Sequence, residues 1–306
     1  MIKLKFCEID SSIRNQMVHQ FYLLNVAEKR NEKKVKRLDQ WCTKYLNGYN
    51  NSLMDIRYMD VVEADPVELE KIKKHLDTLP SCALDELYTI ENGKKRCYII
   101  DTLYKSMHSV AKEHLLKALN VKVCPYCDRN YVFSAGIYNT CELDHFFPKG
   151  KYPILAASFY NLIPVCAYCN KKKSDHEFAF YPHQPVNDQA MIRFSYVPTK
   201  SDFLSNEMSI DIQLDVIDPK IENQITVLGL RDLYKRHNDV VFELVRKSVI
   251  YSESYVTALY NEFKDMFSDR QELNELIFGY AENPDRFGDK PLHKLAYDIR
   301  KDILNE

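Results

Sequence analysis

Residues 121–185 read VKVCPYCDRNYVFSAGIYNTCELDHFFPKGKYPILAASFYNLIPVCAYCNKKKSDHEFAFYPHQP, and this stretch decides the fold. It holds two Cys-x-x-Cys pairs, Cys124 with Cys127 and Cys166 with Cys169. Each pair lets two thiolates reach one ion at about 2.3 Å, and four thiolates close a tetrahedral shell of the structural zinc type. Unrelated core thiols rarely show this doubled spacing, and an iron centre is the less favoured alternative. We therefore predict one structural Zn²⁺ bound by these four cysteines.

The segment between the two pairs is too long for a simple zinc ribbon. Residues 128–165 number 38, whereas such ribbons have about 15 to 20 residues between their pairs. The segment contains Glu142-Leu143-Asp144-His145 and later Asn161-Leu162, and Asn170-Lys171-Lys172-Lys173 follows the second pair directly. A segment with chemistry of its own is therefore inserted between the two halves of the predicted zinc site.

This order of motifs resembles the HNH (ββα-metal) endonuclease family, in the variant in which two Cys-x-x-Cys pairs bracket the active site. The resemblance rests on the doubled pair, the Asp-His dipeptide, Asn-Leu before the second pair and Cys-Asn-x-x-Lys at the end. It is confined to residues 121–185. It implies a β-hairpin with Asp-His on its first strand and Asn-Leu on or near its second. It also implies a helix that Asn170 opens and that packs across both strands.

The resemblance assigns roles by position. It implies that His145 is the general base, that Asp144 and Asn170 bind a catalytic Mg²⁺ or Mn²⁺, and that Asn161 holds the loop after His145. The chemistry asks for the same residue types, because phosphodiester hydrolysis needs a base near neutral pH and a cation on the phosphate. Carboxylate and amide oxygens suit Mg²⁺. Since only two protein ligands are visible, we expect the metal to bind weakly without substrate.

Each of these residues also has a structural interpretation. An isolated Asp144-His145 dipeptide would more often be a hydrogen-bonded structural pair, and Asn161 or Asn170 alone would be a turn or cap residue. Glu142 shares a strand face with Asp144 by the period of two, so it is either an outer contact of the cation or a solvated carboxylate. For His183 we favour a structural role over one as a ligand.

Five lysines form a candidate phosphate-binding rim around the motif: Lys149, Lys151, Lys171, Lys172 and Lys173. Lysines near a helix start oppose the helix dipole unless they meet phosphate, although a bare run of this kind is usually solvated. Residues 121–185 hold 7 basic and 5 acidic residues, a net of 7 − 5 = +2, against 35 − 39 = −4 for the remainder. This difference is too small to establish a nucleic-acid partner by charge alone.

The flanking sequence predicts mostly helices, and only 7 glycines in 306 residues disfavour a turn-rich β fold. Apolar periodicity predicts helices over 13–26, 35–45, 66–79, 98–119, 270–283 and 291–304, a long one from Leu230, and strands over 190–196 and 208–217. We predict a predominantly helical α+β protein in three parts: a helical region 1–120, a zinc-bound nuclease module 121–185, and a strand pair with helices over 186–306.

The remaining expectations concern location and partners. No apolar leader follows Met1 and no run of 18 apolar residues occurs, so we expect a cytoplasmic protein without a membrane partner. The motifs are also similar to the HNH subunits of the Septu and retron-associated antiphage systems, which implies DNA as substrate, with RNA as the alternative, and an ATPase partner of the ABC or SMC type.

The rival hypothesis is a non-catalytic zinc module that binds nucleic acid or protein. Such a module has no reason to keep Asp144, His145 and Asn170 together.

Overall fold

The computed structural model describes residues 2–27, 32–47, 55–107, 109–135, 138–184, 191–280 and 282–304. The chain divides into two compact units. Unit 1 consists of Met1–Ile2, Lys122–Tyr131 and Val186–Glu306, and unit 2 consists of Lys3–Val121 and Val132–Pro185. The predicted module end at Pro185 and the predicted strand start at Ala190 lie outside the described residues.

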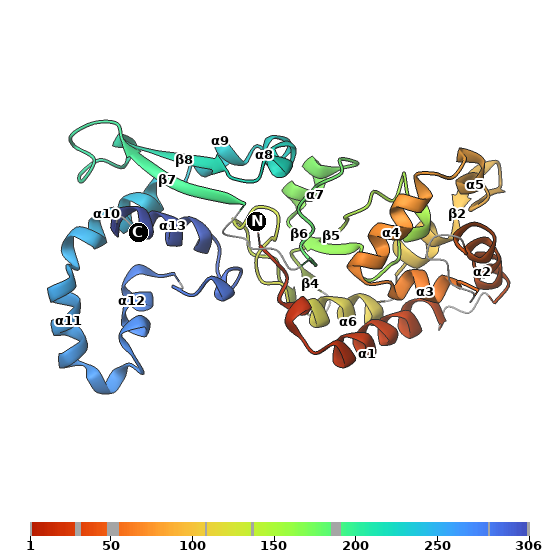
Figure 1. The fold of residues 1–306 in the computed structure, drawn as a ribbon, viewed down its shortest axis with the longest axis horizontal. Coiled ribbons are helices and arrows are strands. Elements are labelled where there is room, and N and C mark those ends of the chain that lie inside the picture. Colours follow the sequence, from red (N-terminus) through yellow and green to blue (C-terminus); the bar gives the residue numbers. More distant parts are fainter. Residues whose placement is uncertain are drawn as a thin grey trace. The chain divides into compact units, whose positions relative to one another are not determined.

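Unit 2 is mainly helical and also carries three short antiparallel strand pairs (Figure 1). Its helices are α1 (Ser11–Tyr22), α2 (Glu32–Leu46), α3 (Tyr58–Glu63), α4 (Pro66–Leu76), α5 (Ser81–Asp85), α6 (Ser109–Leu119) and α7 (Ala167–Lys173), with π-helices at Leu23–Ala27 and Ile99–Tyr104 and 3-10 helices at Lys5–Glu8 and Pro153–Leu155. Its strand pairs are β1 (Tyr88–Glu91) with β2 (Lys94–Cys97), β3 (Ser134–Ala135) with β4 (Tyr138–Asn139), and β5 (Glu142–His145) with β6 (Leu162–Val165).

The helix predicted over 98–119 is divided into two pieces. A π-helix over Ile99–Tyr104 comes first, and α6 begins at Ser109. The Ser106 hydroxyl donates to the Asp101 carbonyl oxygen at 3.2 Å, and a serine side chain that binds backbone in this way competes with regular helical hydrogen bonds. The break places Tyr104 at the end of a π-helix, where its side chain contacts the His145 ring and the Leu143 carbonyl oxygen.

The helices of unit 2 position the loop between β5 and β6. The Ser158 hydroxyl donates to the Val61 carbonyl oxygen at 2.8 Å, and the Phe159 backbone N–H donates to the Val62 carbonyl oxygen at 3.0 Å. The Phe159 ring lies 5.2 Å from that of Phe6 and 5.5 Å from that of Phe21, measured between centroids. All six residues are buried, so α3 and the N-terminal helices hold this loop.

Unit 1 contains one antiparallel strand pair and six helices among its described residues (Figure 1). Strands β7 (Ile192–Pro198) and β8 (Ile210–Val216) pair with Ile192 opposite Val216. The helices are α8 (Glu222–Val227), α9 (Leu230–Tyr234), α10 (Asn238–Ile250), α11 (Glu253–Glu262), α12 (Arg270–Phe278) and α13 (His293–Leu304), with 3-10 helices at Glu207–Ser209, Pro219–Ile221, Lys264–Met266 and Pro284–Arg286. Helix α13 packs against β7 and α10.

Two helix predictions in this unit need correction. The long helix predicted from Leu230 is two helices, because the chain turns at Lys235–His237 before Asn238, a residue type that favours helix starts. The helix predicted over 270–283 ends at Phe278. Gly279 follows it with φ +78°, the left-handed conformation that commonly ends helices.

The loop that carries the first cysteine pair is anchored within unit 1. The Tyr234 hydroxyl donates to the Cys127 carbonyl oxygen at 2.6 Å. The backbone N–H groups of Leu292 and Lys294 donate to the Asp128 carbonyl oxygen and to its Oδ2, at 2.6 and 3.2 Å. Residues of α9 and of the start of α13 therefore fix the backbone of this loop.

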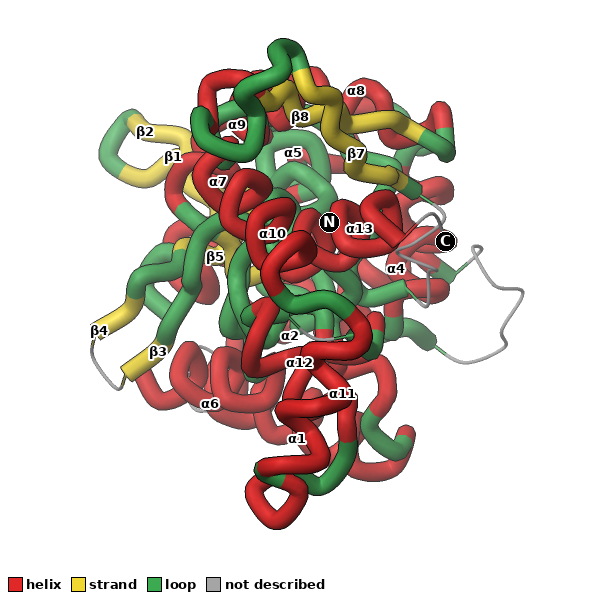
Figure 2. Tube along the Cα trace, turned by 90° about the vertical axis from the view of Figure 1, so that its left-hand side faces the viewer, coloured by secondary structure: helices red, strands yellow, loops and turns green. Residues whose placement is uncertain are grey.

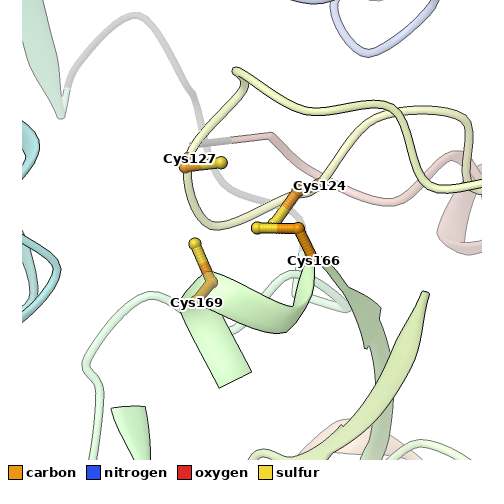
Figure 3. Close-up of side chains that lie close together, drawn as sticks. All are labelled: Cys124, Cys127, Cys166 and Cys169. Atoms are coloured by element: carbon orange, nitrogen blue, oxygen red, sulfur yellow. The ribbon is translucent and has the colours of Figure 1, made fainter. Parts of the chain in front are cut away.

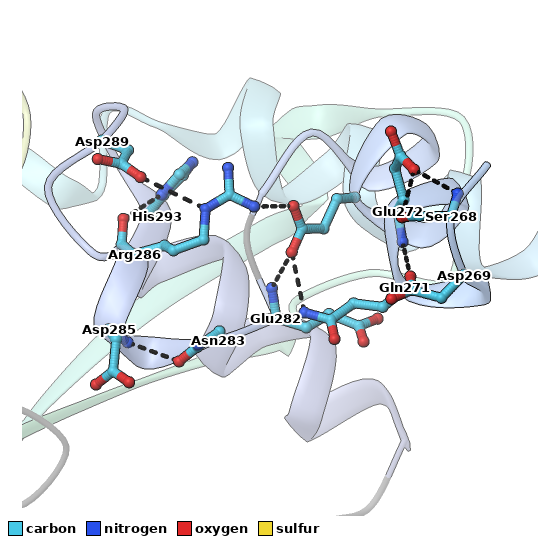
Figure 4. A network of polar contacts seen from close by, with 11 residues as sticks. Ser268, Asp269, Gln271, Glu272, Glu282, Asn283, Asp285, Arg286, Asp289 and His293 are labelled. Carbon is cyan, nitrogen blue, oxygen red and sulfur yellow. Dashed lines mark hydrogen bonds and ion pairs between the residues drawn. The ribbon is translucent and has the colours of Figure 1, made fainter. Parts of the chain in front are cut away.

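A polar network ties α12 to the segment before α13 (Figure 4). Glu275 accepts from Arg286, and its other carboxylate oxygen accepts from the Gln271 amide at 3.1 Å and from the Glu282 backbone N–H at 3.4 Å. Arg286 also reaches Asp289, at 3.5 Å. These residues are partly exposed, so the network orients the segment more than it stabilises it.

The predicted fold class is confirmed. The described residues are predominantly helical, with four two-stranded antiparallel sheets, which Figure 2 shows in yellow. The strand pair predicted after residue 186 is present as β7 and β8. Within the described part of the chain, no helix is long and apolar enough to cross a membrane.

Candidate metal centre and active-site pocket

The four predicted zinc ligands lie close together (Figure 3). The Sγ atoms of Cys124, Cys127, Cys166 and Cys169 are all within 4.8 Å of one another, and all four side chains are buried. Four thiolates at about 2.3 Å from a central ion fit a cluster of this size. The cluster can therefore hold a metal ion.

Local structure places the two thiols of each pair within one turn of backbone. In the first pair, the Asp128 N–H donates to the Cys124 carbonyl oxygen at 2.9 Å, which closes a tight turn in which Asp128 has φ 52°. In the second pair, Cys166 occupies the N-cap of α7 and Cys169 lies in its first turn. A tight turn and a helix start thus form the two halves of the cluster.

The hairpin β5–β6 and helix α7 form the predicted ββα arrangement. Asp144 lies opposite Ile163 and His145 opposite Leu162, and α7 packs against β5. Helix α7 differs from the prediction in one respect, because Cys166 caps it and Asn170 is its fourth residue rather than its first. The lysines after Asn170 consequently lie in the last turn, where the helix dipole favours cations, and the predicted conflict with the dipole does not arise.

Asn161 binds the backbone on both sides of the loop that follows His145. Its Oδ1 accepts from the Phe147 N–H at 2.7 Å, and its Nδ2 donates to the carbonyl oxygens of Phe147 at 3.2 Å and Leu155 at 2.9 Å. The side chain is fully buried. This geometry is what a residue that holds the His145 loop requires.

His145 is a buried histidine with a defined tautomer. Its Nε2 lies 3.0 Å from the Ala156 carbonyl oxygen, which only accepts, so Nε2 carries the proton and Nδ1 has a lone pair. No described residue is hydrogen-bonded to Nδ1. Burial, assisted by the positive charge of Lys149, lowers the pKa of His145 to about 3. The ring is therefore neutral at physiological pH, and Nδ1 carries an unprotonated lone pair.

Tyr104 is a site residue that the sequence did not reveal. Its ring meets that of His145 edge-on at a centroid distance of 4.2 Å, and its hydroxyl donates to the Leu143 carbonyl oxygen at 2.9 Å. The ammonium of Lys149 lies 5.4 Å from the centroid of the Tyr104 ring. Tyr104 ends a π-helix some 40 residues before His145, so no motif spacing points to it, although π-helical turns frequently occur at functional sites.

A polar pocket with a volume of about 220 Å³ brings the predicted residues together. Its lining includes Asp144, His145, Asn170, Lys149, Lys171 and Tyr104. It therefore joins the proposed base, both proposed cation ligands and two of the five predicted rim lysines in one cavity of unit 2.

Lys173 lies in the interior rather than on the rim. Its side chain is 0% exposed, and its ammonium lies 3.1 Å from Asp144 Oδ2 and 3.3 Å from Oδ1. It also donates to the His145 carbonyl oxygen at 2.7 Å. Burial lowers the pKa of Lys173, and the negative charge of Asp144 opposes that shift. Lys173 is the last residue of α7, and this helix packs against β5. The Lys173 side chain therefore lies next to Asp144, a residue of that strand.

Two further rim lysines have other surroundings. Lys151 forms ion pairs with Glu177 at 2.6 Å and with Asp77 at 3.7 Å. Lys172 is exposed, and its ammonium lies 6.0 Å from the ring centroid of Tyr168. Lys149 and Lys171 are therefore the rim lysines that line the pocket.

Glu142 and Asn170 are joined directly. The Asn170 Nδ2 donates to Glu142 Oε2 at 2.6 Å, between the exposed first residue of β5 and the middle of α7. This bond commits the amide nitrogen of Asn170 to Glu142 and leaves its Oδ1 as the acceptor end. The sequence analysis predicted that Glu142 is either an outer contact of the cation or a solvated carboxylate. In the structure Glu142 accepts a hydrogen bond from Asn170, which is a predicted cation ligand.

Comparison with known proteins defines the class of this site. Residues 124–176 match the family model of the HNH endonucleases, and this range includes both cysteine pairs, β5, β6 and α7. The chain is also similar to Septu protein PtuB of Bacillus thuringiensis, with 38% identity over 63 residues, or 21% of this chain. The match spans only 23% of that relative's length. No solved structure matches the chain.

Proposed function

We propose that this protein is a divalent-metal-dependent endonuclease that hydrolyses phosphodiester bonds, with DNA as its substrate. The observation that carries the proposal is the pocket that joins a neutral histidine, two carboxylates, an amide and two lysines. A non-catalytic zinc module would need the cysteine cluster but not this convergence. The match of residues 124–176 to the HNH endonucleases supports the same conclusion.

In this proposal the residues of the pocket divide the work. His145 uses Nδ1 to take the proton from the attacking water, while Ala156 fixes the ring through Nε2. Lys149 and Lys171 bind and orient the phosphate. Asn161 keeps the backbone after His145 in place. Tyr104 fixes the plane of the imidazole from its edge.

Asp144 and Asn170 would hold the catalytic cation, Mg²⁺ or Mn²⁺. They supply one carboxylate and one amide oxygen, the hard donors that such ions take, and both line the pocket with His145. When bound, the cation would stabilise negative charge on the phosphate and on the leaving oxygen. The second ion is structural Zn²⁺ on Cys124, Cys127, Cys166 and Cys169, for which four buried thiolates are the preferred set.

We further propose that the protein is the nuclease effector of a bacterial antiphage system, acting with an ATPase of the ABC or SMC type. The similarity to Septu protein PtuB supports this proposal. The functional module is residues 121–185, and the flanking regions 1–120 and 186–306 would serve regulation or assembly. This functional division follows the motifs and differs from the division into two compact units.

A substrate panel tests the proposal. The purified protein, freed of loosely bound divalent ions, is incubated with plasmid, single-stranded DNA and total RNA, with and without added Mg²⁺ or Mn²⁺. We expect cleavage of DNA only when the ion is added, leaving 5′-phosphate and 3′-hydroxyl ends. Cleavage of RNA alone would correct the substrate class, and no cleavage of any substrate in the presence of either ion would contradict the proposal.

A further inference from the structure

A fully buried lysine is engaged with the carboxylate that is proposed to bind the cation. The ammonium of Lys173 lies within 3.3 Å of both carboxylate oxygens of Asp144 and also binds the His145 carbonyl oxygen. Asp144 is itself 3% exposed. The same positive charge therefore contacts two consecutive residues of the site, one through its side chain and one through its backbone.

Stability alone is a poor reason for this arrangement. Burying two charges removes them from water, and replacing a buried ion pair by apolar groups of similar size is often neutral or stabilising. The helix could have ended with an exposed lysine, as Lys172 one residue earlier is exposed. The pair is instead placed where a divalent cation would compete for the same carboxylate oxygens.

The charge balance of the pocket points to the effect on metal binding. Asp144 and Lys173 together are neutral, Lys149 and Lys171 add two positive charges to the lining, and Asp175 adds one negative charge, so the balance is positive by one. Glu142 contributes negative charge, but it is exposed and bound to the Asn170 amide. A divalent cation at Asp144 would be repelled at short range by the Lys173 ammonium. The negative charge of a phosphodiester in the pocket would offset that repulsion.

We propose that Lys173 is a positioning residue with two roles toward Asp144. It fixes the orientation of the carboxylate, and its charge keeps the affinity for a divalent cation low until a nucleic-acid phosphate enters the pocket. This inference rests on the proposed function, in which Asp144 binds the cation. It makes the metal site dependent on substrate, so that the ion and the phosphate bind cooperatively.

The test is Mn²⁺ binding in the absence of nucleic acid, measured by the loss of the free-ion electron paramagnetic resonance signal. Lys173→Met removes the charge and keeps the length of the side chain. We expect it to bind Mn²⁺ more tightly than the wild type, on the order of tenfold, because the competing charge is gone. Lys172→Met is the matched control, since the same charge is lost from an exposed position, and its affinity should equal that of the wild type.

A second readout uses thermal unfolding. Lys173→Met removes the positive charge next to the buried Asp144 carboxylate, so Mn²⁺ should raise the Tm of the variant by several degrees more than that of the wild type. The double variant Asp144→Asn, Lys173→Met has no such carboxylate, and Mn²⁺ should leave its Tm unchanged. Should Lys173→Met not fold, Lys173→Gln, which can still donate to Asp144, is judged by the same two criteria.

The outcomes separate this inference from the proposed function. Mn²⁺ binding that is lost in Asp144→Asn but is no tighter in Lys173→Met or Lys173→Gln overturns the role of Lys173 and leaves the metal site intact. Mn²⁺ binding to the wild type that is unaffected by Asp144→Asn overturns the metal-site assignment itself, and with it this inference.

Discussion

At the scale of single residues, His183 gives the clearest pH dependence. Its ring is buried among Phe6, Tyr160 and Tyr181, and neither ring nitrogen has a hydrogen-bond partner among the described residues. Burial lowers the pKa of His183 to about 3. This environment supports the structural role that the sequence favoured, because a histidine held neutral among aromatic rings contributes packing rather than charge.

We predict that His183 makes the protein acid-sensitive. Below the unfolded pKa of about 6.5, the unfolded chain binds a proton that the folded protein excludes, so the free energy of unfolding falls as the pH drops toward 3 and is unaffected above about pH 7. Between pH 7.5 and pH 5, the wild type should lose about 2 kcal/mol more than His183→Phe in urea unfolding. Equal losses in the two proteins would show that His183 does not contribute.

A second prediction at this scale concerns Asn161. Asn161→Ala removes three buried hydrogen bonds and leaves backbone groups of Phe147 and Leu155 without partners, so we expect a loss of about 2–4 kcal/mol in the free energy of unfolding. Asn170→Ala, which removes one bond to an exposed carboxylate, should cost less than about 1 kcal/mol. Similar losses in the two variants would contradict the role assigned to Asn161.

Sequence and structure agree on some residues of the pocket and not on others. The motif order was sufficient to predict that Asp144, His145 and Asn170 lie close together, and the three residues line one cavity. Tyr104 could not be predicted from the sequence, because its contact with His145 depends on a π-helix far upstream of the motif. The interior position of Lys173 was also hidden, since a run of three lysines does not show which one faces a strand.

At the scale of elements, periodicity predicted where helices and strands occur but not where they break. The strand pair and most helices lie where apolar spacing placed them. The breaks at Lys105–Met107 and Lys235–His237 do not follow from it, because the apolar spacing continues through both. At the first break the Ser106 hydroxyl donates to the Asp101 carbonyl oxygen, a contact that apolar spacing does not indicate.

The two cysteine pairs lead to a prediction about metal content. We expect one equivalent of zinc per chain by elemental analysis. Cys166→Ser should lose that zinc and much of the stability of the site, because the binding free energy of a structural zinc is folding free energy of roughly 10 kcal/mol. Cys82→Ser, at an exposed cysteine, is the control and should keep both. Well-folded wild-type protein with less than about half an equivalent of zinc would refute the assignment.

At the scale of the whole molecule, sequence predicted the class of fold but not the division into units. Residues 122–131 belong with the C-terminal part of the chain because Tyr234, Leu292 and Lys294 bind their backbone and Asp128. These contacts join residues more than 100 positions apart. Local patterning carries no information on such pairings.

The flanking regions, rather than the nuclease module, are the predicted docking surface for a partner. Helices α10 to α12 and the 3-10 helix Lys264–Met266 expose large apolar side chains, among them Val249, Met266 and Leu276. Co-expression with the neighbouring reading frame should yield a complex, and the double variant Met266→Asp, Leu276→Asp should lose the partner while keeping its Tm. A monomer with full, unregulated nuclease activity and no retained partner would count against this prediction.

The central claim is that His145 is the base in a nucleic-acid-cleaving pocket, and one rate comparison tests it most directly. Wild type, His145→Ala and His19→Ala, an exposed histidine in the same unit, are purified identically and assayed on the preferred DNA substrate with Mn²⁺. We predict that His145→Ala lowers the cleavage rate by about 10²- to 10⁴-fold without loss of zinc or of the fold, and that His19→Ala matches the wild type. Undiminished cleavage by His145→Ala would contradict the account, because it would assign the activity to another site.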